Sequence, residues 1–346
     1  MGLIDTLSSG FKVVQRRPWL ILLPVMLDLW LWLGPRWSIQ PLADSLLRLL
    51  AAQNMPPEMA QMVDPYRDLL TAAGASFNLW WLLDNNPTWL STILPGLAGP
   101  AQLGAAPAAI TGSAAALLLW SPLLLLLGVA LGSLFMAAVA SQLPAQRPDE
   151  EETPDQAANA ADMPRQGGGA GFWLRRALRT FGLATLFSLL ILALLLLVSL
   201  LLSLVMTPLF LISPQAGAGA ASLAALMIGW FAVMAYLMLY FVLAAIVSDG
   251  IGLRQAIWRS LNVVYRNFWS TVGLLLLLTL ISWGFGLIWQ RLAATSTLGV
   301  LAAIAGNAVL ITGLTAARLI FYRDRCGRWL AALGAQQAPT EPPAQL

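Results

Sequence analysis

The stretch from Gly252 to Trp289 constrains the fold most, because it joins an amphipathic helix to an apolar run that is long enough to cross a membrane. Apolar residues recur at steps of three or four in its first half and predict one side of a helix: Leu253, Ile257, Leu261, Val264 and Phe268. Its basic residues fall away from that side. From Trp269 about 20 apolar residues follow, enough to cross hydrocarbon roughly 30 Å thick. The stretch therefore predicts a basic helix on a membrane surface that leads into a transmembrane helix.

Composition extends this prediction to the whole chain. Hydrophobic residues make up 59% of the 346 residues and charged residues only 10%, whereas soluble domains are about a quarter charged. The chain contains no histidine and a single cysteine, Cys326. These counts exclude Ser-His-Asp hydrolysis, Cys-His nucleophiles and histidine-ligated zinc or haem. We expect neither an enzyme nor a bound metal or cofactor. Cys326 is expected to be an ordinary reduced cysteine, with a reactive thiol as the alternative.

Hydropathy predicts an all-α fold, a polytopic membrane helix bundle with six transmembrane helices. Basic amphipathic helices are expected at the membrane surface before transmembrane helices one, three and five. The expected segments are a surface helix with the first crossing (1–34), an outer cap (35–113), the second crossing (114–142), a linker (143–171), a surface helix with crossings three and four (172–247), a surface helix with crossings five and six (248–333), and a tail (334–346).

Proline and glycine predict the bends of the central hairpin. Pro208 is expected to bend or end the third crossing, 183–211, near the outer surface. The Gly/Ala-rich segment 213–221 is expected to be a tight turn, so that the third and fourth crossings form an antiparallel hairpin. The fourth crossing is expected to run as one helix from Leu223 to Val247.

The segments between the crossings are polar or mixed. The cap, 35–113, combines short amphipathic patterns with Trp80, Trp81 and Trp89, a mixture that favours the lipid headgroup layer. The alternative is that the cap forms a lid over a ligand pocket. The linker is acidic and rich in Gly and Pro, so it cannot bury enough surface to fold alone. The tail is expected to be disordered.

Charge distribution predicts the orientation. With both termini in the cytoplasm, fifteen of the 19 basic residues lie on the cytoplasmic side, and the positive-inside rule favours this arrangement. We therefore expect a multi-pass protein of the cell (inner) membrane. Its cytoplasmic face should attract anionic lipid, and the candidate headgroup residues are Arg16, Arg17, Arg175, Arg176, Arg179, Arg254, Arg259, Arg266 and Arg318. Arg318 is expected to reach headgroups from the inner end of helix six, and Asp249 and Arg254 to cap or pair locally. Nucleic acid binding is not expected, because the aromatic residues among these cations follow lipid burial.

The N-terminal segment resembles the stretch described first. A shift of 250 positions places Gly2, Leu3, Val13, Val14, Arg16 and Trp19 on identical residues, six identities in 18 positions. The segment 172–181 fits less well. The chain is interpretable as three units, each a surface helix followed by a transmembrane hairpin. Any two basic amphipathic helices look somewhat alike, so coincidence stays open as the alternative.

Two segments carry a family resemblance. The sequences VSDGIGLRQAIWRSLNVVYRNFW (247–269) and RRPWLILLPVMLD (16–28) resemble bacterial six-helix membrane proteins that are related to the membrane domain of glycerophosphoryl diester phosphodiesterases. The resemblance covers the helical core but neither the cap nor the linker. It implies a six-helix membrane fold without implying the activity, because no phosphodiesterase catalytic domain is present.

Asp28 is the one carboxylate well inside a predicted crossing, about 14 Å from the inner edge at roughly 1.5 Å per residue. Its insertion costs about 2.5 to 3.5 kcal/mol, so it should have a partner or be protonated. Asn307 is predicted at a similar depth. Two interpretations stay open: the pair lines a proton or substrate path, or it forms one interhelical hydrogen bond that sets packing.

The favoured function is a non-enzymatic membrane protein that organises lipid or a membrane partner complex through its basic cytoplasmic face. The first alternative is a transporter or permease subunit with a path near Asp28, although the E-A-A pattern of importer permeases is missing from 248–269. The least favoured alternative is a lipid-active membrane enzyme. Such an enzyme needs a cluster of carboxylates, and the only one, at 149–155, lies in the linker.

Overall fold

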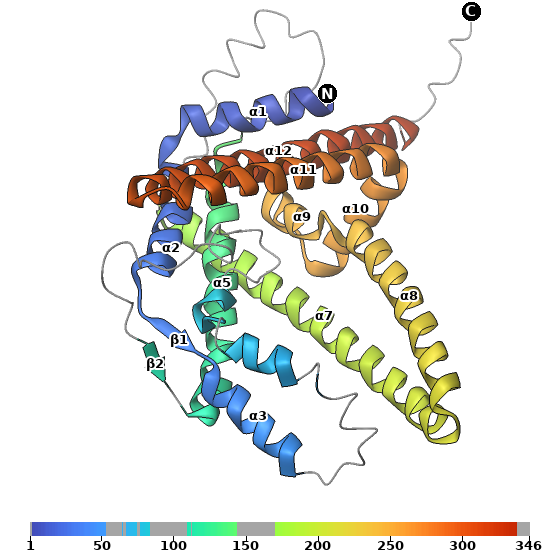
Figure 1. The fold of residues 1–346 in the computed structure, drawn as a ribbon. Coiled ribbons are helices and arrows are strands. Elements are labelled where there is room, and N and C mark those ends of the chain that lie inside the picture. Colours follow the sequence, from blue (N-terminus) through green and yellow to red (C-terminus); the bar gives the residue numbers. More distant parts are fainter. Residues whose placement is uncertain are drawn as a thin grey trace, which may run out of the picture. The chain divides into compact units, whose positions relative to one another are not determined.

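The computed structural model describes residues 2–52, 64, 67–74, 77–83, 109–111, 113–143 and 170–337 (Figure 1). Most of these residues are helical, which confirms the all-α class. The linker 143–171 falls almost entirely outside the described residues, as do much of the cap and the last nine residues of the tail. The predictions for those segments are therefore not decided by the structure.

Among the described residues, five helical segments are long and apolar enough to cross a membrane. They are α5 (Ala114–Ser141), most of α7 (Ala170–Ile212), α8 (Pro214–Leu239) together with α9 (Val242–Asp249), α11 (Phe268–Ala293), and α12 (Thr297–Gln337). The chain is therefore a multi-pass membrane protein.

The predicted first crossing is a shorter apolar segment. It consists of η1 (Pro18–Ile21) followed directly by α2 (Leu22–Leu33). At about 1.5 Å per residue this segment is roughly 24 Å long, against about 30 Å for an average hydrocarbon core. Its length alone does not establish a sixth crossing.

The central hairpin differs from the prediction in two places. The middle surface helix, expected at 172–181, is the first part of α7, which continues without interruption to Ile212 and includes Pro208 near its end. The expected Gly/Ala turn is instead helical, so that Ser213 alone separates α7 from α8 (Figure 1). Alanine is the strongest helix former, and here it outweighs the glycines that suggested a turn.

The described part of the cap is held by aromatic packing and by a pair of strands that the sequence did not predict. β1 (Arg36–Ser38) pairs in parallel with β2 (Ala109–Thr111), close in sequence to α3 (Gln40–Ala52). The ring of Trp80, in η2 (Leu79–Leu83), lies 5.6 Å from that of Trp30. Trp80, which was predicted for the headgroup layer, thus packs on a tryptophan of the predicted first crossing.

By packing, the chain divides into two compact units. The first comprises Met1–Val13, Met136–Leu278 and Gly313–Leu346; the second comprises Val14–Phe135 and Thr279–Thr312. Each unit has its own buried polar site, described below.

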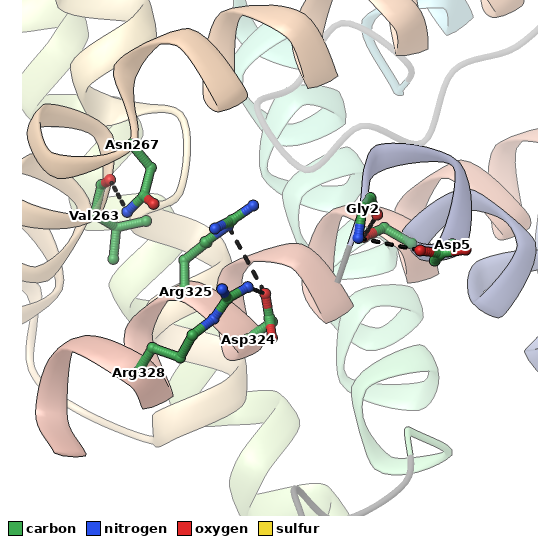
Figure 2. Close-up of polar contacts among 8 residues, drawn as sticks. Gly2, Asp5, Val263, Asn267, Asp324, Arg325 and Arg328 are labelled. Carbon is green, nitrogen blue, oxygen red and sulfur yellow. Dashed lines mark hydrogen bonds and ion pairs between the residues drawn. The ribbon is translucent and has the colours of Figure 1, made fainter. Parts of the chain in front are cut away.

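The two helices related by the 250-residue shift have matching bounds. α1 (Leu3–Arg16) and α10 (Leu253–Arg266) have 14 residues each. Each ends at a residue whose N–H donates to the carbonyl of a valine: Arg17 to Val14 and Asn267 to Val264, both at 3.2 Å. The side chain of Asn267 adds a second cap by donating to Val263 O at 3.0 Å (Figure 2).

Burial also matches between the two helices. The fully buried positions are Thr6, Gly10, Val13 and Val14 in α1, and Ala256, Ser260, Val263 and Val264 in α10. These are the same positions under the shift. The larger residues of the predicted apolar side, such as Leu253 and Ile257, are only half-buried. Small residues therefore face the protein, and the agreement of bounds and burial supports a repeat over coincidence.

Gly10 is where α1 lies directly on the backbone of α12. A Cβ atom on Gly10 would be 2.5 Å from Gly313 O and 2.8 Å from Ala317 Cβ. A Cβ atom on Gly313 would be 2.6 Å from the ring of Phe11. Gly313 and Ala317 are four residues apart, the small-xxx-small spacing that lets membrane helices approach closely.

We expect Gly10→Ala to lower the free energy of unfolding by about 1 to 3 kcal/mol, because the added methyl overpacks the contact, although alanine is the better helix former. The matched control is Gly229→Ala in α8, where a Cβ meets nothing within 4 Å. Thermal unfolding of both variants in one detergent checks this. Equal stabilisation of the two would contradict the close packing of α1 on α12.

Candidate functional site

Asp28 of α2 and Asn307 of α12 meet inside the second unit. Their side chains are 1% and 7% exposed, and Asn307 Nδ2 donates to Asp28 Oδ2 at 3.5 Å. The two residues thus lie together as the sequence predicted. The next buried positions on α12, Ala303, Ile304 and Ala308, are apolar. A single carboxylate with an amide partner fits a packing bond and a proton site equally well.

Within the described part of the chain, no three or more Cys, Asp or Glu side chains gather where they could hold a metal ion. The buried polar contacts described next are made instead by arginine side chains, backbone carbonyls and hydroxyl groups. They lie in the first unit, around an interruption of the fourth predicted crossing.

That crossing is broken at Tyr240 and Phe241, between α8 and α9. One hydroxyl serves the backbone on both sides of the break. Ser260 Oγ, from α10, donates to Met238 O at 2.7 Å and accepts from the N–H of Phe241 at 3.1 Å. A side chain inserted into the helical hydrogen-bond ladder is a recognised cause of a kink. The packing of α10 against the break therefore accounts for it.

Arg318 of α12 serves the same break. Its guanidinium donates to Tyr240 O and lies over the Tyr240 ring, 4.1 Å from the centroid. The residue is 4% exposed. The prediction that Arg318 reaches lipid headgroups is therefore wrong. An arginine near the end of an apolar run suggests such a contact from sequence, but α12 continues to Gln337 and Arg318 is buried against Tyr240.

Asp249, the last residue of α9, links α10 and α12. Its Oδ2 accepts from Arg259 Nη1 at 2.5 Å and from the Tyr322 hydroxyl at 2.7 Å. Burial disfavours the charged form of Arg259, but the hydrogen bond and the charge of Asp249 more than offset this, so that the pKa of Arg259 is raised. The predicted local partner was Arg254, yet Arg259 takes that place.

A left-handed glycine makes this arrangement possible. Gly250, with φ of 63°, ends α9 and lets the chain turn directly into α10. Arg176 of α7 donates to the last carbonyls of α9, reaching Val247 O at 3.2 Å and Ser248 O at 3.4 Å. The two hydrogen bonds from Arg176 satisfy carbonyl groups at the C-terminus of α9, and the positive charge is also favourable at this negative end of the helix dipole.

The nine candidate headgroup arginines thus separate into two groups. Three are used inside the first unit: Arg176, Arg259 and Arg318. Six are exposed: Arg16, Arg17, Arg175, Arg179, Arg254 and Arg266. Further along α12, Asp324 pairs with Arg325 and Arg328 (Figure 2), which leaves less free positive charge there than the sequence suggests.

Sequence reasoning missed the residues that hold the break. Ser260 and Tyr240 carry no motif, and their contacts join positions far apart in the chain. The available signal was weak: a serine at the α10 position equivalent to Gly10 indicates a small residue at a close contact.

Comparison with protein-family models, with curated proteins and with solved structures finds no match.

We expect Ser260→Ala to lower the free energy of unfolding by about 1 kcal/mol, since two hydrogen bonds are lost. Arg318→Met should cost about 2 to 4 kcal/mol, because a buried carbonyl loses a charged donor. The control is Arg254→Met, an exposed arginine, with an effect within about 0.5 kcal/mol. Unfolding curves in one detergent provide the measurement. If the Arg318 and Arg254 variants are equally stable, Arg318 does not hold the break.

Proposed function

We propose that the chain is a non-enzymatic protein of the bacterial inner membrane that organises lipid or a membrane partner complex through a basic cytoplasmic face. The observation that carries the proposal is the exposure of cations beside the ends of the apolar helices. Lys12, Arg16 and Arg17 precede η1, and Arg254 and Arg266 lie between α9 and α11. Exposed cations at such positions attract anionic headgroups.

The proposal includes six crossings with both termini in the cytoplasm. The segment formed by η1 and α2 would be the sixth crossing. A hydrophobic segment a few ångströms short is accommodated by local thinning of the bilayer or by snorkelling of its flanking residues, here Arg16 and Arg17. Charge supports the same count, because an odd number of crossings would place the cations near residues 12–17 and those near 254–266 on opposite sides.

Cysteine labelling in intact cells tests this topology. In a Cys326→Ala background, Ala294→Cys, between α11 and α12, should react with a membrane-impermeant maleimide. Ser8→Cys in α1 should react only after the cells are opened. Both positions are exposed, so burial does not confound the result. Labelling of Ser8→Cys in intact cells would show that the N-terminus is outside and would overturn the six-crossing arrangement.

Transport along a path near Asp28 is the second candidate function, and the buried contact between Asp28 and Asn307 favours it. We rank it lower because a proton pathway normally contains a series of polar groups, and the buried residues within four positions of Asn307 on α12 are apolar, with the hydroxyl of Thr312 the next polar group.

Proteoliposomes with a pH-sensitive dye inside separate the two functions. We expect no protein-dependent proton flux under an imposed potential, and no difference between wild type and Asp28→Asn, which keeps the size and hydrogen-bonding ability of the side chain. A flux that Asp28→Asn abolishes, while Asp44→Asn in α3 leaves it unchanged, would favour transport instead.

A further inference from the structure

We propose that α10 is the lipid-binding element of the basic face, and that its exposed side binds the phosphate headgroups of anionic phospholipid. The proposal rests on the proposed function, because it places α10 at the cytoplasmic surface of a membrane. It adds the identity of the partner and the residues that hold it.

Three kinds of side chain follow one another around α10. The small residues Ala256 and Ser260 are fully buried against the protein, while Leu253, Ile257 and Leu261 are half-buried. At about 100° per residue these aliphatic residues lie between the buried side and an exposed stripe. That stripe consists of Arg254, Trp258 and Tyr265, with Arg266 beyond it. The change around the helix from aliphatic residues to a stripe of one arginine and two aromatic rings, with a second arginine beyond it, matches the change of a bilayer from chains to headgroups.

Two of the three arginines of α10 are available for a ligand. Arg259 is used by Asp249. Neither Arg254 nor Arg266 forms an ion pair with any residue that the structure describes. Both are exposed, Arg254 within the exposed stripe and Arg266 beyond it. The two residues lie 12 positions apart on α10, about 18 Å along the helix at roughly 1.5 Å per residue, so each uncommitted guanidinium group is placed to bind the phosphate of a separate lipid.

The aromatic residues distinguish α10 from a merely basic helix. Trp258 is 63% exposed and Tyr265 is 80% exposed. Rings with one polar atom are favoured at headgroup depth, where the apolar ring and the N–H or O–H are both accommodated. The equivalent positions of α1 are Ser8 and Gln15, although α1 keeps the cation Arg16. The two repeats thus share a scaffold, and only α10 carries the aromatic stripe.

The test measures lipid binding to the purified full-length protein by native mass spectrometry, with phosphatidylglycerol and phosphatidylcholine in competition. We expect wild type to prefer phosphatidylglycerol. Arg254→Gln with Arg266→Gln should reduce that preference by about 5-fold per cation, or about 30-fold together at low salt. Arg254→Lys with Arg266→Lys should keep most of it. Arg291→Gln, an exposed cation at the end of α11, is the control and should change nothing.

The aromatic contribution is tested separately with Trp258→Ser and Tyr265→Gln, which introduce the residues of α1. This pair should weaken the binding of both lipids and leave their ratio unchanged, because the rings recognise depth in the membrane and not charge. Melting temperatures equal to that of wild type confirm that the exposed substitutions leave the fold intact.

Other outcomes overturn the proposal in distinguishable ways. If wild type shows no preference for phosphatidylglycerol, the lipid-organising form of the proposed function fails together with this proposal. If the preference survives in the α10 glutamine variant and disappears in Lys12→Gln with Arg16→Gln and Arg17→Gln, the basic face binds lipid but α10 is not the site. If the α10 variant keeps its lipid and loses a co-purifying membrane protein, α10 is a protein-binding surface.

Discussion

Tyr240 and Phe241 are buried, so the backbone groups that leave the helix at this break have no water to bond and must be satisfied by the protein itself. Ser260 and Arg318 do this from two different helices. These hydrogen bonds hold α10 and α12 against the end of α8. The helix that follows the break, α9, is completely buried from Val242 to Val247.

Small residues rather than large ones make the closest contacts. Gly10 lies on Gly313 and Ala317, and Ser260 lies on the end of α8. Large aliphatic side chains gain little by leaving lipid for protein, because lipid is equally apolar, whereas small residues let two backbones approach. The same preference explains why α1 and α10 bury the same four positions and keep their leucines and isoleucines at the flanks. This shared packing is stronger support for a repeat than the identities in sequence.

What could be predicted depended on how local the cause was. The bounds of α5 and α11 follow from continuous apolar runs, and the meeting of Asp28 with Asn307 follows from the need of a buried carboxylate for a partner. The break in the fourth crossing could not be predicted, because Tyr240 and Phe241 are not helix breakers and their partners are 19 and 78 residues away. Arg318 was assigned to headgroups because its burial depends on a neighbouring helix that its own sequence does not reveal.

The distance in sequence between Tyr240 and Arg318 has a consequence for biosynthesis. Arg318 emerges from the ribosome 78 residues after Tyr240, so the kinked segment enters the bilayer before its charged donor exists. Ser260 arrives first and can hold the kink only in part. Folding of the hairpin is therefore completed only when α12 has been made. A nascent chain that stops before α12 would leave the carbonyl of Tyr240 without its charged donor, and membrane quality-control proteases would meet this incompletely folded segment.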